Sequence, residues 1–430
     1  MDPFNELPME IRLEILLSVR TKESMAALIS ASPTLLRVYL SVKAEILRNL
    51  VAADLDDELI QHAVAIVEFP DRTQFRKAHL AAWNERQLPN PLQGHYPQIF
   101  EKVDKLHSLI LHFMQDYIAK ATSDFPSREY LCLPNIHAPA LDGHTVFRGQ
   151  KMGILPRTDL LTDSERNRFL KAFLLFELNC KAVESGLGSR VQQRRGVPYD
   201  IPKVLVSDRD SNAVRCIHTY VSSLHGAIFA QCGDAWLPEP PNESSLEPGL
   251  MFPDSLYPDP NNYFSDLGIP QLHDGGGAAD FAKFGLELVV EFLSYDISDP
   301  QQKESLLIRL EDFWHSYQRR VARYSHLIFE VSPHLTDEGL IYDHLKRQLT
   351  STRELQREVF QQRAWVFFDD ARLYPLRCIA PHFPSAAILE NERYNMVWFQ
   401  GWEDNSARIR ALCRSQKWHD DYKKEMDSDA

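Results

Sequence analysis

Residues 7–19 read LPMEIRLEILLSV, and this stretch decides how the start of the chain folds. Pro8 suits the first position of a helix, where its missing amide hydrogen costs nothing. When the residues are spaced at 100° intervals, the apolar side chains cover an arc of about 240°, whereas one core-facing stripe needs only about 100°. Glu10, Glu14 and Ser18 mark the remaining polar face. The stretch therefore predicts a helix with apolar contacts on two sides.

Two further helices are predicted directly after it. Thr21 can cap a helix over residues 22–31, and Ser32-Pro33 is a start signal for a helix that runs to about Val51. Three helices in about 45 residues form too small a body to cover both apolar sides of the first one. Either the downstream part of the chain or another protein must cover the second side.

The remainder of the chain is dominated by helical periodicity. Thr162 and Glu165 have the spacing of a capping box, and apolar residues follow at i, i+3 and i+4. Residues 204–206 and 364–368 are the best strand candidates, and both are short. Other amphipathic helices are predicted over residues 96–121, 212–231, 278–295, 301–329, 338–360 and 405–426. The chain is thus predicted to be all-α.

Long connections rich in proline or glycine separate the helices, at residues 123–161, 186–211 and 233–277. Residues 233–277 contain eight prolines, six glycines and no Lys or Arg, and they carry eight of the thirteen net negative charges. Such a composition cannot continue a helix. Because the stretch also contains many aromatic side chains, we expect an acidic arm that packs parts of itself onto the helical body.

Composition narrows the function classes. The 430 residues are 44% hydrophobic and 25% charged, as in soluble globular proteins, and the formal charge is -13. An acidic chain argues against nucleic-acid or membrane binding, both of which use clustered Lys and Arg. No secretory signal and no apolar stretch of about 20 residues is visible. We therefore expect the cytoplasm or nucleus, with the six dispersed cysteines reduced.

Several clusters of polar residues are candidates for chemical sites, and each also has a structural interpretation. His218 and His225 are interpreted as partly buried, hydrogen-bonded histidines, and Asp369, Asp370 and Arg372 as a helix cap with an ion pair. The basic and aromatic residues of 309–324 are interpreted as a charged helix over an aromatic core. Residues 273–277 are interpreted as a turn before a helix, and residues 418–422 as a solvated terminus. We therefore predict no catalytic, cofactor-binding or metal-ligating residue.

A family resemblance is carried by the first 50 residues. Leu7-Pro8-x-x-Ile11-x-x-x-Ile15-Leu16, followed by Leu28-Ile29 and a third helix, resembles an F-box. The segments ALISASP at 27–33, RVYL at 37–40 and EIL at 45–47 look like the version found in filamentous-fungal F-box-like proteins. Residues 280–295 and 363–373 look similar to stretches in the carboxy-terminal parts of such proteins.

The resemblance implies a substrate receptor of a ubiquitin ligase. Residues 1–70 would form the F-box-like module, and residues 71–430 an irregular multi-helix domain that recognises a target protein of unknown identity. The module would dock onto a Skp-type adaptor, which joins it to a cullin scaffold, and other subunits would transfer the ubiquitin. The residues implied in adaptor contact are Leu7, Pro8, Ile11, Ile15, Leu16 and Leu28.

Two alternatives remain open from the sequence. The chain could be a structural or scaffold protein whose first helix is covered internally, with Leu7, Ile11 and Ile15 packed against residues beyond 70. It could also be an α-helical enzyme with titratable groups converging from residues 278–295, 301–329 and 338–360.

Overall fold

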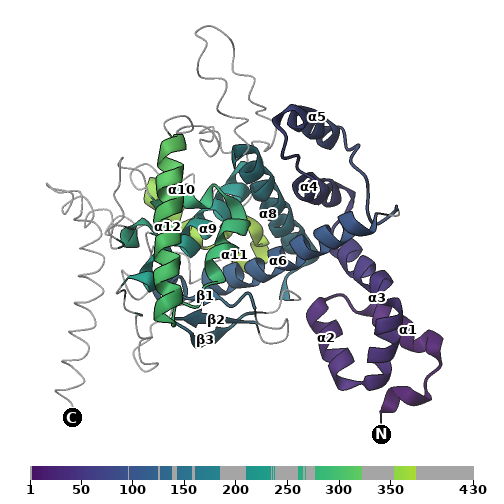
Figure 1. Cartoon of the computed structure of the whole chain (residues 1–430). Coiled ribbons are helices and arrows are strands. Elements are labelled where there is room, and N and C mark those ends of the chain that lie inside the picture. Colours follow the sequence, from purple (N-terminus) through teal and green to yellow (C-terminus); the bar gives the residue numbers. More distant parts are fainter. Residues whose placement is uncertain are drawn as a thin grey trace, which may run out of the picture.

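The computed structural model describes residues 2–94, 96–123, 126–137, 143–156, 160–184, 210–233, 235, 237, 260–264, 267, 277–321 and 353–373. Within these residues the fold is all-α, with one small sheet (Figure 1). The N-terminal half contains η1 (Pro3–Glu6), α1 (Met9–Ser18), α2 (Lys22–Ala31), α3 (Pro33–Asp54), α4 (Asp57–Val67), α5 (Thr73–Asn84), α6 (Pro97–Ala121), α7 (Pro126–Glu129), β1 (Leu133–Pro134), β2 (His144–Phe147) and β3 (Gln150–Ile154). The remainder contains α8 (Asp163–Glu184), α9 (Ser211–Cys232), η6 (Pro260–Tyr263), α10 (Gly277–Ala282), α11 (Gly285–Leu293), α12 (Pro300–Val321), α14 (Arg353–Gln362), η8 (Trp365–Phe367) and α15 (Asp370–Leu373).

The start signals read from the sequence are confirmed. The Thr21 side chain accepts a hydrogen bond from Ser24 N, and the Ser32 side chain accepts one from Leu35 N, so each caps its helix. At α8 the capping box is complete, since Thr162 Oγ1 accepts from Glu165 N at 3.2 Å and Glu165 Oε2 accepts from Thr162 N at 3.1 Å. Pro8 differs from its predicted place, because it precedes the helix as the residue that caps α1.

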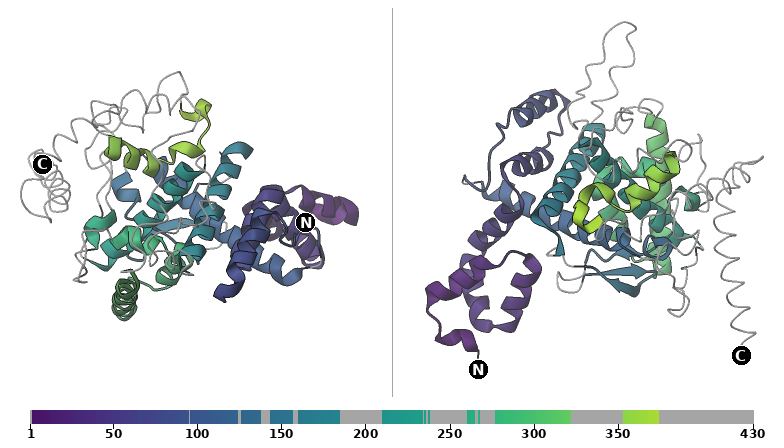
Figure 2. Two further views of the ribbon diagram at one scale, coloured as in Figure 1. Left: turned by 90° about the horizontal axis from the view of Figure 1, so that it is seen from above. Right: turned by 180° about the vertical axis from the view of Figure 1, so that it is seen from behind.

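Helices α1, α2 and α3 form a small three-helix module with its own core, which projects from the rest of the molecule (Figures 1 and 2). Its buried residues are Leu16, Met25, Leu35, Val38, Ile46 and Leu50. From Val51 through α4 the buried apolar side chains belong to the large core of the body, where α4 packs against α6 and α8. The small core thus spans residues 16–50, and α4, which lies within the predicted module of residues 1–70, packs on the body.

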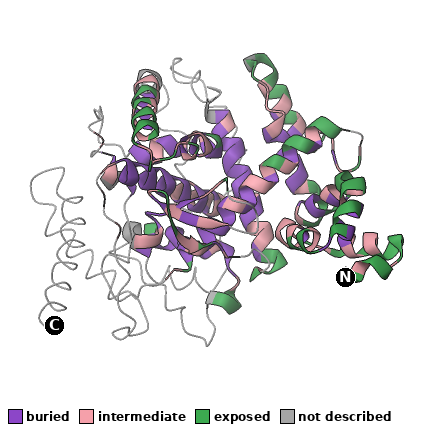
Figure 3. Ribbon diagram, turned by 60° about the horizontal axis from the view of Figure 1, so that its bottom comes forward, coloured by how far each residue is buried: buried purple, intermediate pink, exposed green. Residues whose placement is uncertain are grey.

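The body is built around α6, α8 and α9. An aromatic cluster joins these helices to η8: Tyr117 stacks on Tyr220 with ring centroids 4.5 Å apart, and Phe169 stacks on Phe367 at 4.1 Å. Figure 3 shows that fully buried residues concentrate in this body, whereas the N-terminal module is mostly intermediate or exposed. The larger of the apolar cores therefore lies in the body.

The connection at 123–161 contains an antiparallel three-stranded sheet in the order β1-β2-β3. The β2–β3 turn uses Arg148 and Gly149, both with positive φ, which matches the twist of a tight hairpin. Gln231 at the end of α9 holds the sheet in place, because its side chain donates to Leu131 O at 2.7 Å and accepts from Arg148 N at 2.9 Å.

The single helix predicted over 278–295 is wrong, because α10 and α11 are separate helices. The break falls at Gly285, whose φ of 75° favours glycine, and a Cβ there would lie 2.9 Å from the Glu177 carboxylate. Glu177 accepts a hydrogen bond from Leu286 N at 2.7 Å and so satisfies a free amide at the start of α11.

The strand predicted at 364–368 is also wrong, since residues 365–367 form the 3-10 helix η8. Ala364 has a left-handed backbone that reverses the chain before η8. The carbonyls around this turn are held by the body: Tyr130 donates to Gln362 O at 2.5 Å, and Arg168 donates to Phe367 O at 2.7 Å. The predicted strand at 204–206, the predicted helix at 405–426 and most of the one predicted at 338–360 lie outside the described residues.

Parts of the acidic arm pack onto the body, as expected from its aromatic content. Phe264 is fully buried and contacts the rings of Phe229, Phe281 and Trp314. Two glycines make room for this segment. A Cβ at Gly226 would lie 2.6 Å from Pro260, and one at Gly277 would lie 2.5 Å from the Phe264 ring. The arm is thus seated on the helical body at residues 260–264.

Candidate docking surface

The chain before α1 is fixed by polar contacts to α3. Asp2 accepts hydrogen bonds from Phe4 N at 3.0 Å, from Ser32 Oγ at 2.7 Å and from Thr34 N at 3.2 Å. The bond from Ser32 is the largest of several that lower the pKa of the Asp2 carboxyl to about 2. The N-terminal turn is therefore held at the start of α3 rather than left free.

Arg12 holds the other side of this turn. Its Nε donates to Phe4 O at 2.8 Å and its Nη2 donates to Asn5 O at 2.7 Å, which satisfies two carbonyls of η1. Because Arg12 lies on α1, these bonds orient the turn that precedes Leu7 and Pro8. The predicted contact residues are thus presented by an ordered segment.

Four of the six predicted contact residues lie at least partly at the surface of α1 and the turn before it. Pro8 is exposed, Leu7 and Ile15 are half-buried, and Ile11 is 42% exposed although it is a large aliphatic residue. Leu28 on α2 is half-buried and packs against the small core.

Leu16 differs from the others and corrects the predicted set. It is fully buried in the small core. A side chain without accessible surface cannot contact a partner while the module keeps this fold. The burial of Leu16 instead fixes the rotation of α1 about its own axis, and this rotation leaves Ile11 at the surface.

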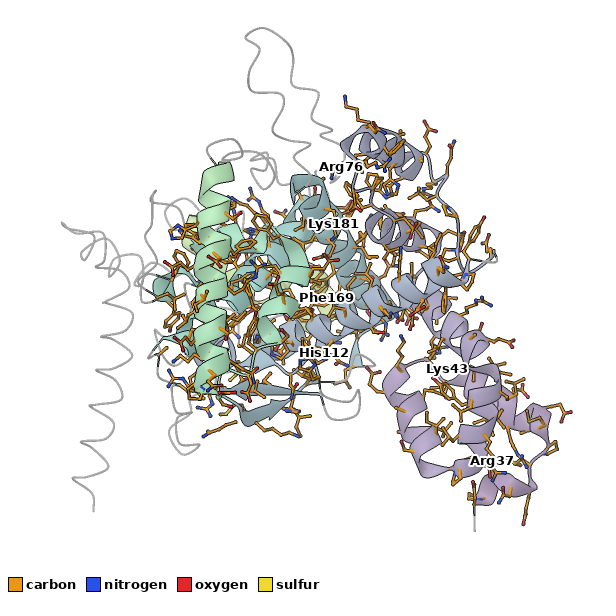
Figure 4. All side chains as sticks on the ribbon, viewed as in Figure 1. Arg37, Lys43, Arg76, His112, Phe169 and Lys181 are labelled. Atoms are coloured by element: carbon orange, nitrogen blue, oxygen red, sulfur yellow. The ribbon has the colours of Figure 1, made fainter. Side chains whose placement is uncertain are left out.

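The structure adds three exposed apolar residues that sequence reasoning missed. Met9 on α1 is 48% exposed, and Leu36 and Leu40 on α3 are 38% and 63% exposed. Leu36 and Leu40 are four residues apart and therefore share one helical face. Their signal was present in the sequence as a second apolar stripe on the third helix, beside the stripe that forms the core. Figure 4 shows this helix with Arg37 and Lys43 labelled on the module.

The composition of the small core does not support the alternative in which residues beyond 70 cover the first helix. All its buried residues lie between Leu16 and Leu50, and the partly buried residues that pack on it lie between Phe4 and Leu47. Among the described residues, none beyond 70 belongs to this core. Leu7, Ile11 and Ile15 are therefore left with partly accessible surface on the module.

The body holds a buried polar cluster that the sequence did not indicate. Lys120 and Asp116 are both buried, and Lys120 Nζ donates to Asp116 Oδ2 at 2.6 Å. Tyr220 donates to the same oxygen at 2.7 Å, and burial, followed by the charge of Asp116, raises the pKa of the Tyr220 phenol well above its ordinary value. Lys120 also lies over the rings of Tyr130 and Tyr220. This arrangement neutralises two buried charges and ties α6 to α9.

The two histidines considered from the sequence behave differently. His218 Nε2 lies 3.1 Å from Ala279 O, and so its interpretation as a partly buried, hydrogen-bonded histidine is confirmed. His225 is fully buried beside Phe229, Phe281 and Phe292, and neither ring nitrogen has a hydrogen-bond partner among the described residues. Burial lowers the pKa of His218 to about 4 and that of His225 to about 3, which keeps both rings neutral at pH 7.

An ion pair is found at the Asp369–Arg372 cluster as predicted, whereas the Asp369 carboxylate bonds to Thr162 and Arg168 and not to the first amides of α15. Asp369 accepts from Thr162 Oγ1 at 2.7 Å and from Arg168 at 2.6 Å, while Arg372 donates to the buried Glu165 at 2.8 Å. Trp314 and Tyr317 belong to the core, and Arg309 pairs with Glu291. Residues 273–276 and 418–422 lie outside the described residues. The part of the chain that the structure describes contains no group of three His, Cys, Asp or Glu able to hold a metal ion.

No helix in the described ranges is both long and apolar enough to cross a bilayer. Comparison with protein-family models finds no match, and neither curated proteins nor solved structures show significant similarity to the chain.

Proposed function

We propose that this protein is an F-box-like substrate receptor. Its N-terminal module docks onto a Skp-type adaptor that connects it to a cullin scaffold, and its helical body presents a target protein for ubiquitination. The chain supplies proximity between target and ligase and performs no catalysis of its own. It acts in the cytoplasm or nucleus.

The observation that carries the proposal is the exposed apolar surface of a small module that projects from the body. Met9, Ile11, Leu36 and Leu40 are each more than a third exposed, on a unit whose own core is already closed. Four of the nine large apolar residues that are exposed among the described residues fall on this small module, and such a concentration favours a protein-interaction surface. The resemblance of residues 7–50 to an F-box supplies the identity of the partner.

The experiment is a pull-down of the full chain with a Skp-type adaptor. Wild type is compared with Leu7→Ala/Pro8→Ala and with Ile11→Asp, which places a charge on the docking surface without touching the small core. Wild type is expected to bind, and both variants are expected to be depleted from the pull-down.

Ile308→Asp is the matched control, because Ile308 is 56% exposed on α12, in the body. It introduces the same charge at an exposed isoleucine that the proposal does not use, and so it is expected to bind like wild type. No binding by wild type, or equal binding by all variants, would rule out the proposed partner.

A further inference from the structure

We infer that the orientation of the N-terminal module is locked by a polar latch between α2 and α6, centred on Lys22, Asp104 and Ser108. This inference concerns how the module sits on the body and does not depend on which protein binds the module.

The module is joined to the body covalently only through α3, and α3 is not a continuous rod. Val42 in its middle has φ −126° and ψ 21°, outside the helical range. A helix interrupted at one residue bends there more readily than an intact helix. Of the buried residues of the small core, Ile46 and Leu50 alone lie beyond this interruption, so few apolar contacts hold α1, α2 and the first half of α3 at their angle to the body.

The far end of α3 is anchored firmly. Asp54 accepts a hydrogen bond from His107 at 2.8 Å and one from Arg166 at 2.7 Å, which joins α3 to α6 and α8. Burial opposes ionisation of Asp54, but the bonds from His107 and Arg166 outweigh it and hold the pKa of the carboxyl below its ordinary value. This anchor fixes the base of α3, and the part of the module before Val42 is held to that base by the small core and by a further contact to α6.

The latch supplies the second attachment, at the start of α2. Lys22 Nζ donates to Asp104 and, at 2.6 Å, to Ser108 Oγ, so that one side chain binds two successive turns of α6. The Lys22 and Asp104 side chains are only 20% and 21% exposed, which limits screening of the pair by water and salt. Next to it, Gln115 donates to Glu23 at 3.2 Å.

Two attachments far apart in sequence fix an angle that one attachment cannot. Lys22 meets α6 through residues more than 80 positions later in the chain, whereas the α3 anchor lies at Asp54. The helices that carry the exposed Met9, Ile11, Leu36 and Leu40 are thereby held in one direction relative to the body. Loss of the Lys22 charge would release α2 and allow bending at Val42.

The test measures the angle directly in the full chain, as a distance between two spin labels. One label is placed at Arg37→Cys on the module and the other at Glu304→Cys on α12, since both positions are exposed. Cys378 and Cys413 are replaced by serine. The four cysteines of the described residues, Cys132, Cys180, Cys216 and Cys232, are buried, and burial raises the pKa of Cys132 and Cys232 to about 12, so these two thiols stay protonated.

Double electron–electron resonance is expected to show one narrow distance for the labelled wild type and a broadened or shifted distribution for Lys22→Glu. The doubly reversed variant Lys22→Glu/Asp104→Lys restores the pair with exchanged charges and is expected to recover the narrow distribution. Lys105→Glu is the matched control, because Lys105 lies on α6 beside Asp104 but pairs with Glu101 within the same helix.

The inference is overturned if the wild type is already broad, or if Lys22→Glu leaves the distribution unchanged. It is also overturned if the doubly reversed variant stays as broad as Lys22→Glu, because the effect then comes from damage to the fold and not from the lost pair. None of these outcomes bears on adaptor binding, which is measured separately.

Discussion

At the scale of single residues, His225 is the least satisfied polar group that the described core contains. Both ring nitrogens lack hydrogen bonds while three phenylalanines surround the ring. Burying a polar group without partners costs about 1–3 kcal/mol. The buried His225 ring therefore lowers the free energy of unfolding of the helical body.

Replacing His225 with leucine is expected to raise the free energy of unfolding by about 1–3 kcal/mol, because it removes two unsatisfied nitrogens at nearly constant volume. His218→Leu is the matched control, since it breaks a bond to Ala279 O and is expected to lower stability. Denaturant unfolding of both variants checks this. Equal destabilisation by the two would contradict the expectation.

For the buried Lys120–Asp116 pair we expect the opposite result, a loss of stability when one polar group is removed. Lys120→Met leaves the Asp116 carboxylate buried without a counter-charge and is expected to cost about 3–5 kcal/mol of stability. The double variant Lys120→Met/Asp116→Leu removes both charges and is expected to regain most of that loss. Urea unfolding measures both, and a double variant as unstable as the single one would show that the pair is not the cause.

At the scale of elements, helix starts were predicted best. Thr21, Ser32 and Thr162 each act through a hydrogen bond to a residue three positions away, and so the signal is local and readable in the sequence. The break at Gly285 was missed because its cause is Glu177, more than 100 residues earlier. The turn at Ala364 was missed for the same reason, since Tyr117, Tyr130 and Arg168, all far away in sequence, bind the carbonyls around it.

The same contrast applies to the docking surface. The apolar arc of residues 7–19 predicted two-sided contact, and the exposure of Ile11 agrees with it. The burial of Leu16 could not be read from that arc, because the arc does not say which side faces α3. Met9, Leu36 and Leu40 were missed because exposure depends on how three helices pack together.

At the scale of elements, the close packing of residues 260–264 of the acidic arm on the body depends on two glycines. Gly226→Ala and Gly277→Ala would each force a Cβ to within 2.6 Å of arm atoms, which is closer than packed atoms lie. Each is expected to lower stability by about 1–3 kcal/mol through overpacking. Gly143→Ala is the control, because its nearest neighbour would lie at 3.5 Å, and it is expected to change little. Thermal unfolding of the three glycine variants checks this expectation. Equal changes in their melting temperatures would contradict the close packing of the arm at Gly226 and Gly277.

At the scale of the whole molecule, buried histidines set the response to acid. Burial lowers the pKa of His62 and His218 to about 4 and that of His225 to about 3, against 6.5 in the unfolded chain. Between these values the unfolded state binds more protons than the folded state, so stability falls as pH falls. At pH 5 each histidine contributes a loss of about 2 kcal/mol.

Unfolding free energies measured from pH 7 to pH 5 check this response. Stability is expected to fall across that interval, and the fall is expected to be smaller in His225→Leu by about 2 kcal/mol. Asp54 does not interfere, because its lowered pKa places its titration below the interval. A flat profile in wild type would contradict the burial of neutral histidines.

The whole molecule is thus a helical body with a small projecting module (Figure 2), and this module carries exposed apolar side chains. The acidic charge is concentrated in residues 233–277, which suits a basic partner and argues against docking to nucleic acid. The central claim is that the surface around Ile11 binds a partner protein.

That claim is tested most directly by the dissociation constant between the purified full chain and a purified Skp-type adaptor, measured by titration calorimetry. We expect saturable binding by wild type, binding by Ile308→Asp with the same constant, and binding by Ile11→Asp that is weaker by at least about tenfold, or about 1.4 kcal/mol. Undetectable binding by wild type, or an unchanged constant for Ile11→Asp, would contradict it.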